Sequence, residues 1–208
     1  MSYAVKEIFL TLQGEGMQAG RRAVFLRFAG CNLWSGREQD RPNAQCRFCD
    51  TDFVGTDGEN GGRFEAAALA ERVSGVWGEG ERPLVVVTGG EPMLQLDRAL
   101  VDALHSASFE IAAETNGTLP AAAGVDWICV SPKAGTDVVQ RSGDELKLVW
   151  PQAGIDPDSL LAWDFRHFII QPLDGPAREE SMSAAIAYVM ANPRWRLGLQ
   201  SHKLIGMP

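Results

Sequence analysis

The 208-residue sequence predicts an α/β fold, a modified partial (β/α) TIM-like barrel in a single domain. Two observations predict it: strand-length apolar runs recur along the chain, and amphipathic helical patterns lie between several of them. Strands that are apolar on both faces and alternate with helices are typical of a covered parallel sheet. Six such runs are too few for a closed eight-stranded barrel, so we expect an incomplete one. The runs follow an N-terminal EIFLTLQGEG segment and cover residues 23–29, 84–88, 109–114, 127–131, 145–150 and 166–171.

Three apolar stripes at helical spacing predict helices that pack against the sheet. The first stripe contains Phe64, Ala68, Val73, Val76 and Trp77, the second Leu96, Leu100 and Leu104, and the third Met182, Ile186, Val189 and Met190. The glycine-rich segment at 55–62 is typical of a surface loop. No internal repeat divides the chain, so we expect one unit over residues 1–208.

The charge and the N-terminal sequence restrict the partners. A net charge of −8 argues against a nucleic-acid surface, which needs concentrated Lys and Arg, and favours a small substrate. The start, MSYAVKEIFLTL, lacks the basic and apolar segments of an export signal. No window has about 18 uninterrupted apolar residues, so we expect a cytoplasmic protein that does not enter the membrane.

Polar or glycine-rich segments follow five of the predicted strands. The carboxyl ends of parallel strands form the working rim of such folds, so these segments should meet there. Five tips on one rim predict a concave ligand site. The segments are RFAGC, TGGEP (88–92), ETNG (114–117), SPK (131–133) and QPLD (171–174).

Three cysteines, Cys31, Cys46 and Cys49, follow the first of these strands, the last two as the pair CRFC. Three thiolates are one short of closing a tetrahedral metal site or a four-iron cluster, which suggests an open coordination position. The fourth cysteine, Cys129 in DWICV, reads as a buried strand residue.

Two other uses of the cysteines are weaker. A structural zinc site would need a histidine, but His105, His167 and His202 are isolated from one another and from a second CxxC pair. A thioredoxin-like pair would leave Cys31 unexplained. With a four-iron cluster, one iron is open to the amino and carboxylate groups of a small molecule, and Glu91 of TGGEP could accept from its ammonium group.

Arg27 places a fixed positive charge in an otherwise apolar strand, on the same face as Phe25. An unpaired buried charge is very costly, so a partner is required. The partner is either a structural carboxylate of the protein or a substrate carboxylate, which a guanidinium binds with two hydrogen bonds.

The cysteine set, Phe48 before the last cysteine and Gly89 to Pro92 together resemble the radical S-adenosylmethionine superfamily. In that superfamily a CxxxCxxC motif holds a 4Fe-4S cluster and GGEP holds the methionyl part of S-adenosylmethionine. This sequence departs from the pattern, because fourteen residues separate Cys31 from Cys46 instead of three. We interpret the extra residues, at about 35–45, as a polar loop that projects outward without moving the thiolates.

Within the superfamily, the chain resembles the 7-carboxy-7-deazaguanine synthase family through FLTLQGEG, AVFLRFAGCNLW, CDTDF, VVVTGGEP, ETNGT, VSPK, IIQPLD and LGLQSHKLIGMP. The resemblance implies a lyase that converts 6-carboxy-5,6,7,8-tetrahydropterin to 7-carboxy-7-deazaguanine with loss of ammonia, in queuosine biosynthesis. It also implies a homodimer and an electron donor such as a flavodoxin or ferredoxin. The alternatives are a radical activase that modifies a partner protein and a zinc-stapled binding module without enzymatic activity.

The resemblance also assigns residues, with no catalytic side chain beyond the cofactor radical. Cys31, Cys46 and Cys49 would hold the cluster and Thr51 a magnesium ion, although CDTDF alone is more typical of a turn. S-adenosylmethionine would contact Phe48, Cys49, Asp50, Gly89, Gly90, Glu91, Ser131, Pro132, Lys133, Gln171, Pro172, Leu173 and Asp174, the last suited to ribose hydroxyls. The pterin would contact Leu12, Gln13, Gly14, Glu15, Arg27, Thr88, Glu114, His202 and the terminal carboxylate of Pro208. Without the resemblance, LQGEG is interpreted as a plain turn and His202 as a solvated tail histidine.

Overall fold

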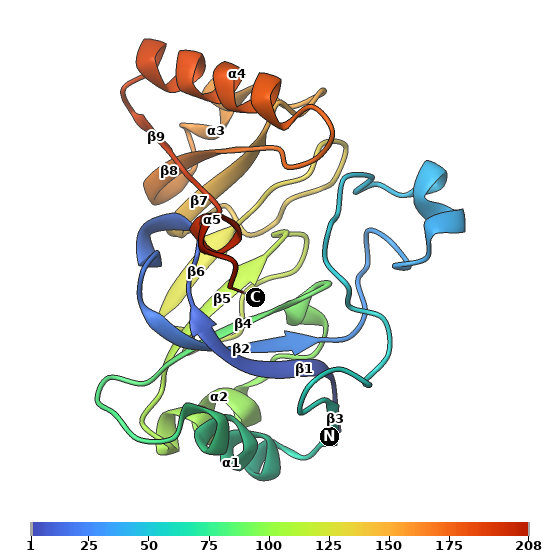
Figure 1. Cartoon of the computed structure of the whole chain (residues 1–208), viewed down its shortest axis with the longest axis vertical. Helices are drawn as coiled ribbons and strands as arrows, with labels where there is room; N and C mark the ends of the chain where they lie inside the picture. The colour runs from blue at the N-terminus through green and yellow to red at the C-terminus, as the bar shows by residue number, and fades with distance from the viewer. Residues whose placement is uncertain (1, 208) are drawn as a thin grey trace.

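The computed structural model describes residues 2–207 and contains one nine-stranded sheet that curls into a partial barrel (Figure 1). The strand order is β3-β1-β2-β4-β5-β6-β7-β8-β9; β1 runs antiparallel to β2 and β3, and every other pairing is parallel. The strands are β1 (Tyr3–Leu12), β2 (Arg22–Phe28), β3 (Gly62–Phe64), β4 (Leu84–Gly89), β5 (Glu110–Thr115), β6 (Trp127–Val130), β7 (Ser142–Trp150), β8 (Asp164–Pro172) and β9 (Trp195–Leu197). The expected partial barrel is therefore confirmed.

The helices lie outside the barrel. They are α1 (Ala66–Trp77), α2 (Arg98–Ser106), α3 (Pro157–Leu160), α4 (Arg178–Ala191) and α5 (Ser201–Ile205), with short 3-10 turns η1 (Gly16–Gln18), η2 (Glu38–Asn43) and η3 (Pro92–Leu94). Asp97 caps α2 by accepting from the Leu100 N–H, and it also accepts from the Tyr3 hydroxyl. This cap ties α2 to the first strand.

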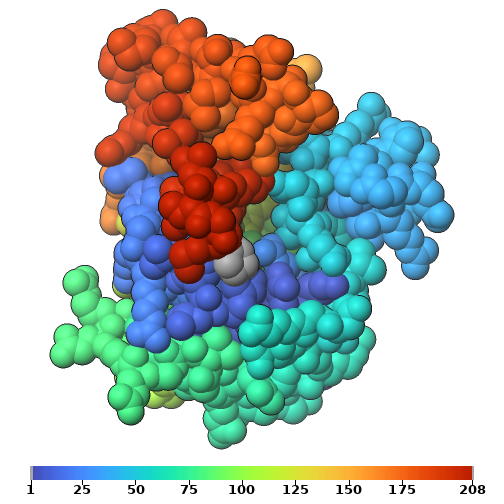
Figure 2. Space-filling model, viewed as in Figure 1, coloured from blue at the N-terminus to red at the C-terminus, as the bar shows by residue number. Residues whose placement is uncertain are grey.

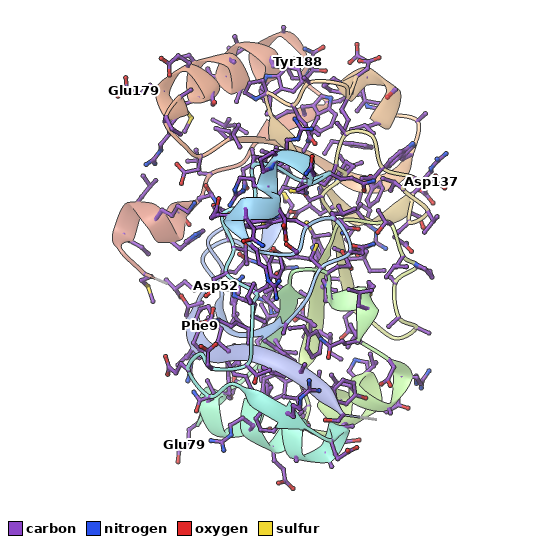
Figure 3. All side chains as sticks on the ribbon, turned by 90° about the vertical axis from the view of Figure 1, so that its right-hand side faces the viewer. Phe9, Asp52, Glu79, Asp137, Glu179 and Tyr188 are labelled. Atoms are coloured by element: carbon purple, nitrogen blue, oxygen red, sulfur yellow. The ribbon has the colours of Figure 1, made fainter. Side chains whose placement is uncertain are left out.

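Two apolar cores fill the space between the sheet and its helices. One joins α1 and α2 to β1, β2, β4 and β5, with Leu69, Val73 and Leu100 fully buried. The other joins α3 and α4 to β7, β8 and β9; there Tyr188, on α4, packs against Trp150 and Trp195 (Figure 3). These outer cores leave the inside of the barrel free for other groups.

The barrel interior changes from apolar to polar along the strands. Its amino-terminal end is closed by Ala23, Leu84, Val86 and Ala112, with Phe25 and Trp127 packed against them. Further along, the buried or half-buried side chains are charged or polar, among them Glu114, Cys129, Glu145 and Lys147. The polar half opens at the carboxyl ends of the strands, where the ligand site is expected.

Several expectations for individual elements are wrong. The third helical stripe forms a core face only in part: Val189 packs against the second core, but Ile186 and Met190 are exposed, and the smaller Ser181 and Ala185 are buried under α4 instead. Small residues let that helix lie close to the sheet. Phe64 belongs to β3 rather than to a helix. The three-residue strands β3 and β9 were not predicted, because they are too short to show periodicity.

The 55–62 segment is a loop, as expected, but it is bonded to the sheet. The Ile8 N–H donates to the Glu59 carbonyl at 2.7 Å and the Gly58 N–H to the Lys6 carbonyl at 3.0 Å. Lys6 also pairs with Asp52 and Asp57, both at 2.9 Å. These contacts attach the chain segment that follows the CRFC pair to strand β1. None of the helices within residues 2–207 is long and apolar enough to cross a membrane.

Candidate active site

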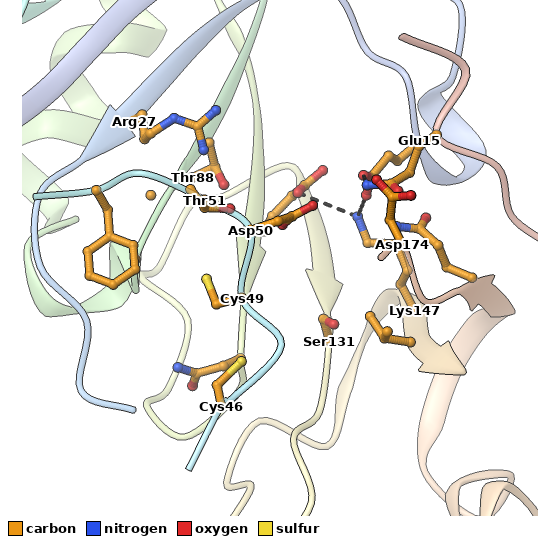
Figure 4. Close-up of a pocket in the computed structure, with 18 of the residues that line it drawn as sticks. Glu15, Arg27, Cys46, Cys49, Asp50, Thr51, Thr88, Ser131, Lys147 and Asp174 are labelled. Carbon is orange, nitrogen blue, oxygen red and sulfur yellow. Dashed lines mark hydrogen bonds and ion pairs between the residues drawn. The ribbon is translucent and has the colours of Figure 1, made fainter. Parts of the chain in front are cut away.

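A cavity of about 390 Å³ opens at the carboxyl ends of the strands. All five polar strand tips contribute to its wall, which confirms the expected concave site. Figure 4 shows Arg27, Thr51 and Thr88 on one side of the cavity and Glu15, Lys147 and Asp174 on the other. The site therefore brings together residues from both ends of the sequence.

The three predicted ligand cysteines line one end of this cavity. Cys31 is half-buried directly after β2, and Trp34, Ala44 and Phe53 form a small apolar cluster against it and Cys49. The hydrogen bond from Cys46 lowers the pKa of Cys49 to about 6, against the effect of burial. Burial raises the pKa of Cys31, and the hydrogen bond to Cys49 together with burial raises the pKa of Cys46, so of the three thiols only Cys49 favours the thiolate form that binds a metal.

The insertion projects from the body of the protein, as expected, and is the light-blue segment at the right of Figure 1. It contains η2, and Arg41 within it lies over the Trp34 ring at 4.0 Å. The same guanidinium donates to the carbonyls of Arg47 and Cys49, at 2.8 and 3.0 Å. The loop is therefore attached to the backbone of the CRFC turn.

These residues fit a four-iron cluster better than a zinc site. His105 pairs with Asp126 at 2.9 Å and His167 stacks on Trp127, so neither lies among the cysteines. His202 lines the same cavity as the cysteines, but its ring packs against Gly14. No three Cys, His, Asp or Glu side chains in residues 2–207 are close enough to hold a single ion. Three thiolates spread along a cavity wall beside an apolar shell suit a larger, multi-iron group.

Within the TGGEP tip, Glu91 does not face the cavity, although it was expected to accept from a ligand ammonium group. Glu91 is fully buried and does not line the cavity; its carboxylate accepts from the Thr115 hydroxyl at 2.7 Å and from the backbone N–H of Asn116 at 2.8 Å. With these partners it braces the neighbouring tip, so it is not placed to accept from an ammonium group. A Cβ atom on Gly90 would lie 2.2 Å from the Gly30 carbonyl oxygen, so close backbone packing requires this glycine.

Arg27 has a protein partner. Its Nε donates to Glu7 at 2.7 Å, which confirms that a structural carboxylate neutralises part of its charge. Its two terminal NH2 groups have no hydrogen bond to another residue in the 2–207 range, and the side chain lines the cavity close to Thr51 and Thr88. Arg27 thus retains donors for a ligand as well as its ion pair.

Glu15 and Glu114 share a buried cation, Lys147. The Lys147 ammonium lies 2.5 Å from Glu15 and 3.5 Å from Glu114, and only 6% of its side chain is exposed. Gln13 donates to Glu114 at 2.9 Å, and Gln200 donates to Glu15 at 2.9 Å. The LQGEG segment is therefore part of the site wall and not a plain turn.

The C-terminal segment folds over the cavity, as Figure 2 shows for the red atoms that cross the N-terminal strands. The backbone N–H and the hydroxyl of Ser201 both donate to the Gly14 carbonyl, at 2.8 and 3.0 Å. His202 lines the cavity, so it is not a solvated tail residue. Pro208 lies outside the described residues.

Most of the residues assigned to S-adenosylmethionine line the same cavity, with Glu91 and Pro132 as the exceptions. Lys133 donates to the hydroxyl of Ser131 at 2.7 Å and lies over the Phe48 ring at 5.9 Å. The carbonyl oxygen of the Gln171 side chain is buried and has no hydrogen-bond partner in residues 2–207. This oxygen lies beside Gly198, where a Cβ atom would be 3.5 Å from it, and it is not exposed to the cavity.

Sequence reasoning missed two lysines of the site. Lys147 sits in ELKLVW, where a charge within a buried strand is the signal that identified Arg27. Lys203 bridges Asp50 at 2.8 Å and Asp174 at 2.6 Å, two assigned residues that are far apart in the sequence. Only the fold brings these two carboxylates together, so no local pattern could reveal this role.

Comparison with known proteins identifies the family. A family model described as the radical SAM superfamily matches residues 39–145, which include Cys46, Cys49 and the GGEP segment. A 7-carboxy-7-deazaguanine synthase of Caulobacter vibrioides is 62% identical over 210 aligned residues that span all of both chains. The chain belongs to the 7-carboxy-7-deazaguanine synthase family.

A second relative and a solved structure support the same family assignment. A 7-carboxy-7-deazaguanine synthase of Burkholderia multivorans is 59% identical, again over the full length of both chains. The crystal structure of QueE from Escherichia coli has a TM-score of 0.75 and 29% identity, and covers 97% of this chain and 95% of that chain. The family assignment excludes the zinc-stapled binding module, since members are radical SAM enzymes.

Proposed function

We propose that this chain is a radical S-adenosylmethionine lyase that converts 6-carboxy-5,6,7,8-tetrahydropterin to 7-carboxy-7-deazaguanine with loss of ammonia, in queuosine biosynthesis. One observation carries the proposal most directly: three cysteines, the Arg27 guanidinium and the carboxylates of Glu15 and Glu114 all line one cavity. A cluster and a small carboxylated heterocycle would thus share one enclosure. No observation of comparable weight supports the alternative, a radical activase that modifies a partner protein.

Cys31, Cys46 and Cys49 would hold the 4Fe-4S cluster, which supplies the electron that cleaves S-adenosylmethionine when both are bound. The apolar cluster of Trp34, Ala44 and Phe53 shields this end of the cavity from water. The backbone of Gly89 and Gly90 lines the adjoining wall and offers polar main-chain atoms to the methionyl part. Glu91 supports that wall from behind.

The adenosine part would lie along Ser131, Lys133 and the 171–174 tip. Gln171 lines this wall, and its side-chain amide is a candidate contact for the ligand. Asp174 remains a candidate for the ribose hydroxyls, although it also accepts from Lys203. Each carboxylate oxygen can accept more than one hydrogen bond, so both contacts are compatible.

The pterin would bind between Arg27 and the carboxylates. Arg27 can offer its terminal NH2 groups to the 6-carboxylate, while its Nε stays on Glu7. Glu15 and Glu114 would accept from the amino and ring N–H groups at the other end of the molecule. Thr88 and His202 line the same space. In this arrangement the protein orients the substrate and excludes water, and the radical chemistry belongs to the cofactor.

Thr51 is the proposed protein ligand for magnesium. Its hydroxyl lies near Arg27 and Thr88 in the cavity wall (Figure 4). Magnesium keeps several waters and takes few protein ligands, so a single hydroxyl together with the substrate carboxylate is chemically reasonable. The homodimer, the flavodoxin or ferredoxin donor and the cytoplasmic location remain predictions from the family resemblance.

The test is an anaerobic incubation of reconstituted protein with reductant, S-adenosylmethionine, magnesium and the carboxypterin, followed by mass spectrometry. Formation of 7-carboxy-7-deazaguanine supports the whole proposal. Deoxyadenosine without the deazaguanine would keep the cofactor chemistry and reject the substrate. Iron, sulfide and zinc analysis of the same sample checks the metal, and a zinc protein without sulfide would reject both.

A further inference from the structure

Lys147 is a buried cation at the centre of the proposed pterin end of the cavity. It lies on β7 between Leu146 and Leu148, whose side chains point to the outer core and are fully buried. Because successive side chains of a strand point to opposite faces, Lys147 points into the barrel, on the same face of β7 as Glu145. Burying an ammonium group there is costly unless carboxylates surround it.

The charged groups around Lys147 come from four parts of the chain. Glu15 follows β1 and Glu114 lies near the end of β5, and both are within ion-pair distance of the ammonium. Glu145 and Cys129 lie behind it, and Lys133 is a second cation near the cysteines. Glu145 is occupied by the Met17 N–H at 2.8 Å and by the Cys129 thiol at 3.4 Å. Glu15 and Glu114 line the main cavity, whereas Glu145 does not. Both also accept from protein groups, but each carboxylate oxygen can accept more than one hydrogen bond.

A carboxylate in a poorly solvated site is driven toward its neutral form unless a cation lies beside it. Burial would raise the pKa of Glu15, but the Lys147 charge and hydrogen bond lower it to about 2. The pKa of Lys147 is raised well above its ordinary value by the same carboxylates, in spite of its burial. Glu15 and Lys147 are thus mutually dependent in charge.

A carboxylate accepts hydrogen bonds at both oxygens, whereas a protonated carboxyl group must donate at one of them. The amino-pyrimidinone half of a pterin presents N–H donors along one edge. We propose that Lys147 is a positioning residue that holds Glu15 and Glu114 as an oriented pair of acceptors for those N–H groups. This inference rests on the proposed function, because it takes the pterin as the ligand of this end of the cavity.

The experiment measures the Kd of 6-carboxypterin, a stable fluorescent analogue, for the reconstituted holoenzyme and for K147M, from pH 5.5 to pH 8. The ratio of variant to wild-type Kd cancels the titration of the pterin itself. We expect this ratio to be at least about tenfold at pH 6 and to fall toward one as rising pH ionises the Glu15 carboxyl group. K147R should restore most of the affinity.

K147Q keeps an amide donor without the charge and gives the same test if K147M does not fold. R21M is the matched control, since it removes the Arg21–Glu110 ion pair at the opposite end of β5 and should leave the Kd ratio near one at every pH. A ratio for K147M or K147Q that is near one throughout, or raised equally at all pH values, would overturn the inference. Failure of the wild type to bind 6-carboxypterin would instead reject the proposed substrate.

Discussion

His202 packs directly on Gly14, so closely that a Cβ atom at position 14 would lie 2.0 Å from the imidazole Nδ1. Real Cβ atoms are not found at such a distance, so the absence of a side chain at Gly14 permits the contact. Ser201 anchors the same turn by donating to the Gly14 carbonyl. The C-terminal segment is thereby seated on the LQGEG segment, and the two together close one side of the cavity.

The substitution G14A should displace His202 and loosen the C-terminal segment. We expect the KM for the carboxypterin to rise about tenfold, because His202 and Glu15 would lose their alignment toward the ligand. Trypsin should also cleave faster after Lys203. The control is G75A: Gly75 lies within α1, and a Cβ atom there would meet no other atom within 4 Å, so alanine should stabilise the fold by about 0.5–1 kcal/mol and leave the kinetics unchanged. An unaltered KM in G14A would contradict the contact.

The substitution K203M should free the C-terminal segment by a different route. Lys203 joins it to both Asp50 and Asp174, but it is partly exposed, so we expect a stability loss of only about 1 kcal/mol or less. Hydrogen exchange at 201–207 should nevertheless increase. R178M is the comparison, because it removes a longer 3.8 Å pair with the same Asp174 from α4. Equal exchange in K203M and the wild type would show that these ion pairs do not hold the segment.

Removal of each cysteine should separate the cluster ligands from Cys129. C31A, C46A and C49A should each lose most of the iron that the wild type retains, about four atoms per chain for a 4Fe-4S cluster. C129A should retain it, because Cys129 contacts Glu145 inside the barrel and does not line the main cavity. Iron and sulfide analysis after anaerobic reconstitution measures this. Full iron content in C31A, or its loss in C129A, would contradict the assignment.

The Glu15–Lys147 pair should make the free energy of unfolding fall as the pH is lowered into the acid range. Because the pKa of Glu15 is lowered to about 2 in the fold, its contribution is present above its unfolded pKa of about 4.3 and is lost as pH falls toward 2. The raised pKa of Lys147 acts in the other direction, since its contribution is lost only at strongly alkaline pH. Urea unfolding from pH 5 to pH 3 should therefore show a shallower decline in E15Q than in the wild type. The difference should be on the order of 2 kcal/mol, and parallel curves would contradict it.

The sequence was sufficient for the parallel strands and the polar rim. The run LVVVTG of β4, buried along nearly its whole length, is long enough to be recognised, and the polar residues after it must then lie at the carboxyl end of the sheet. The three cysteines, grouped after one strand in the sequence, line the same cavity, and their role as cluster ligands stays a prediction. The Arg27 argument also held, because the cost of a buried charge required a partner and the structure supplies Glu7.

The remaining features depend on contacts between distant segments. Glu91 was expected to face a ligand, but it is fully buried, does not line the cavity and accepts from the ETNG tip. Ile186 and Met190 were expected to be buried, but α4 packs through Ser181 and Ala185 instead. Periodicity identifies an apolar stripe without identifying which face the neighbouring strands leave room for.

The most direct test of the account is electron paramagnetic resonance of the reduced, reconstituted protein before and after S-adenosylmethionine is added. The account predicts a 4Fe-4S signal whose g-values change on addition, because Cys31, Cys46 and Cys49 leave one iron for the cofactor to chelate. An unchanged spectrum, or a fourth protein ligand on that iron, would contradict it.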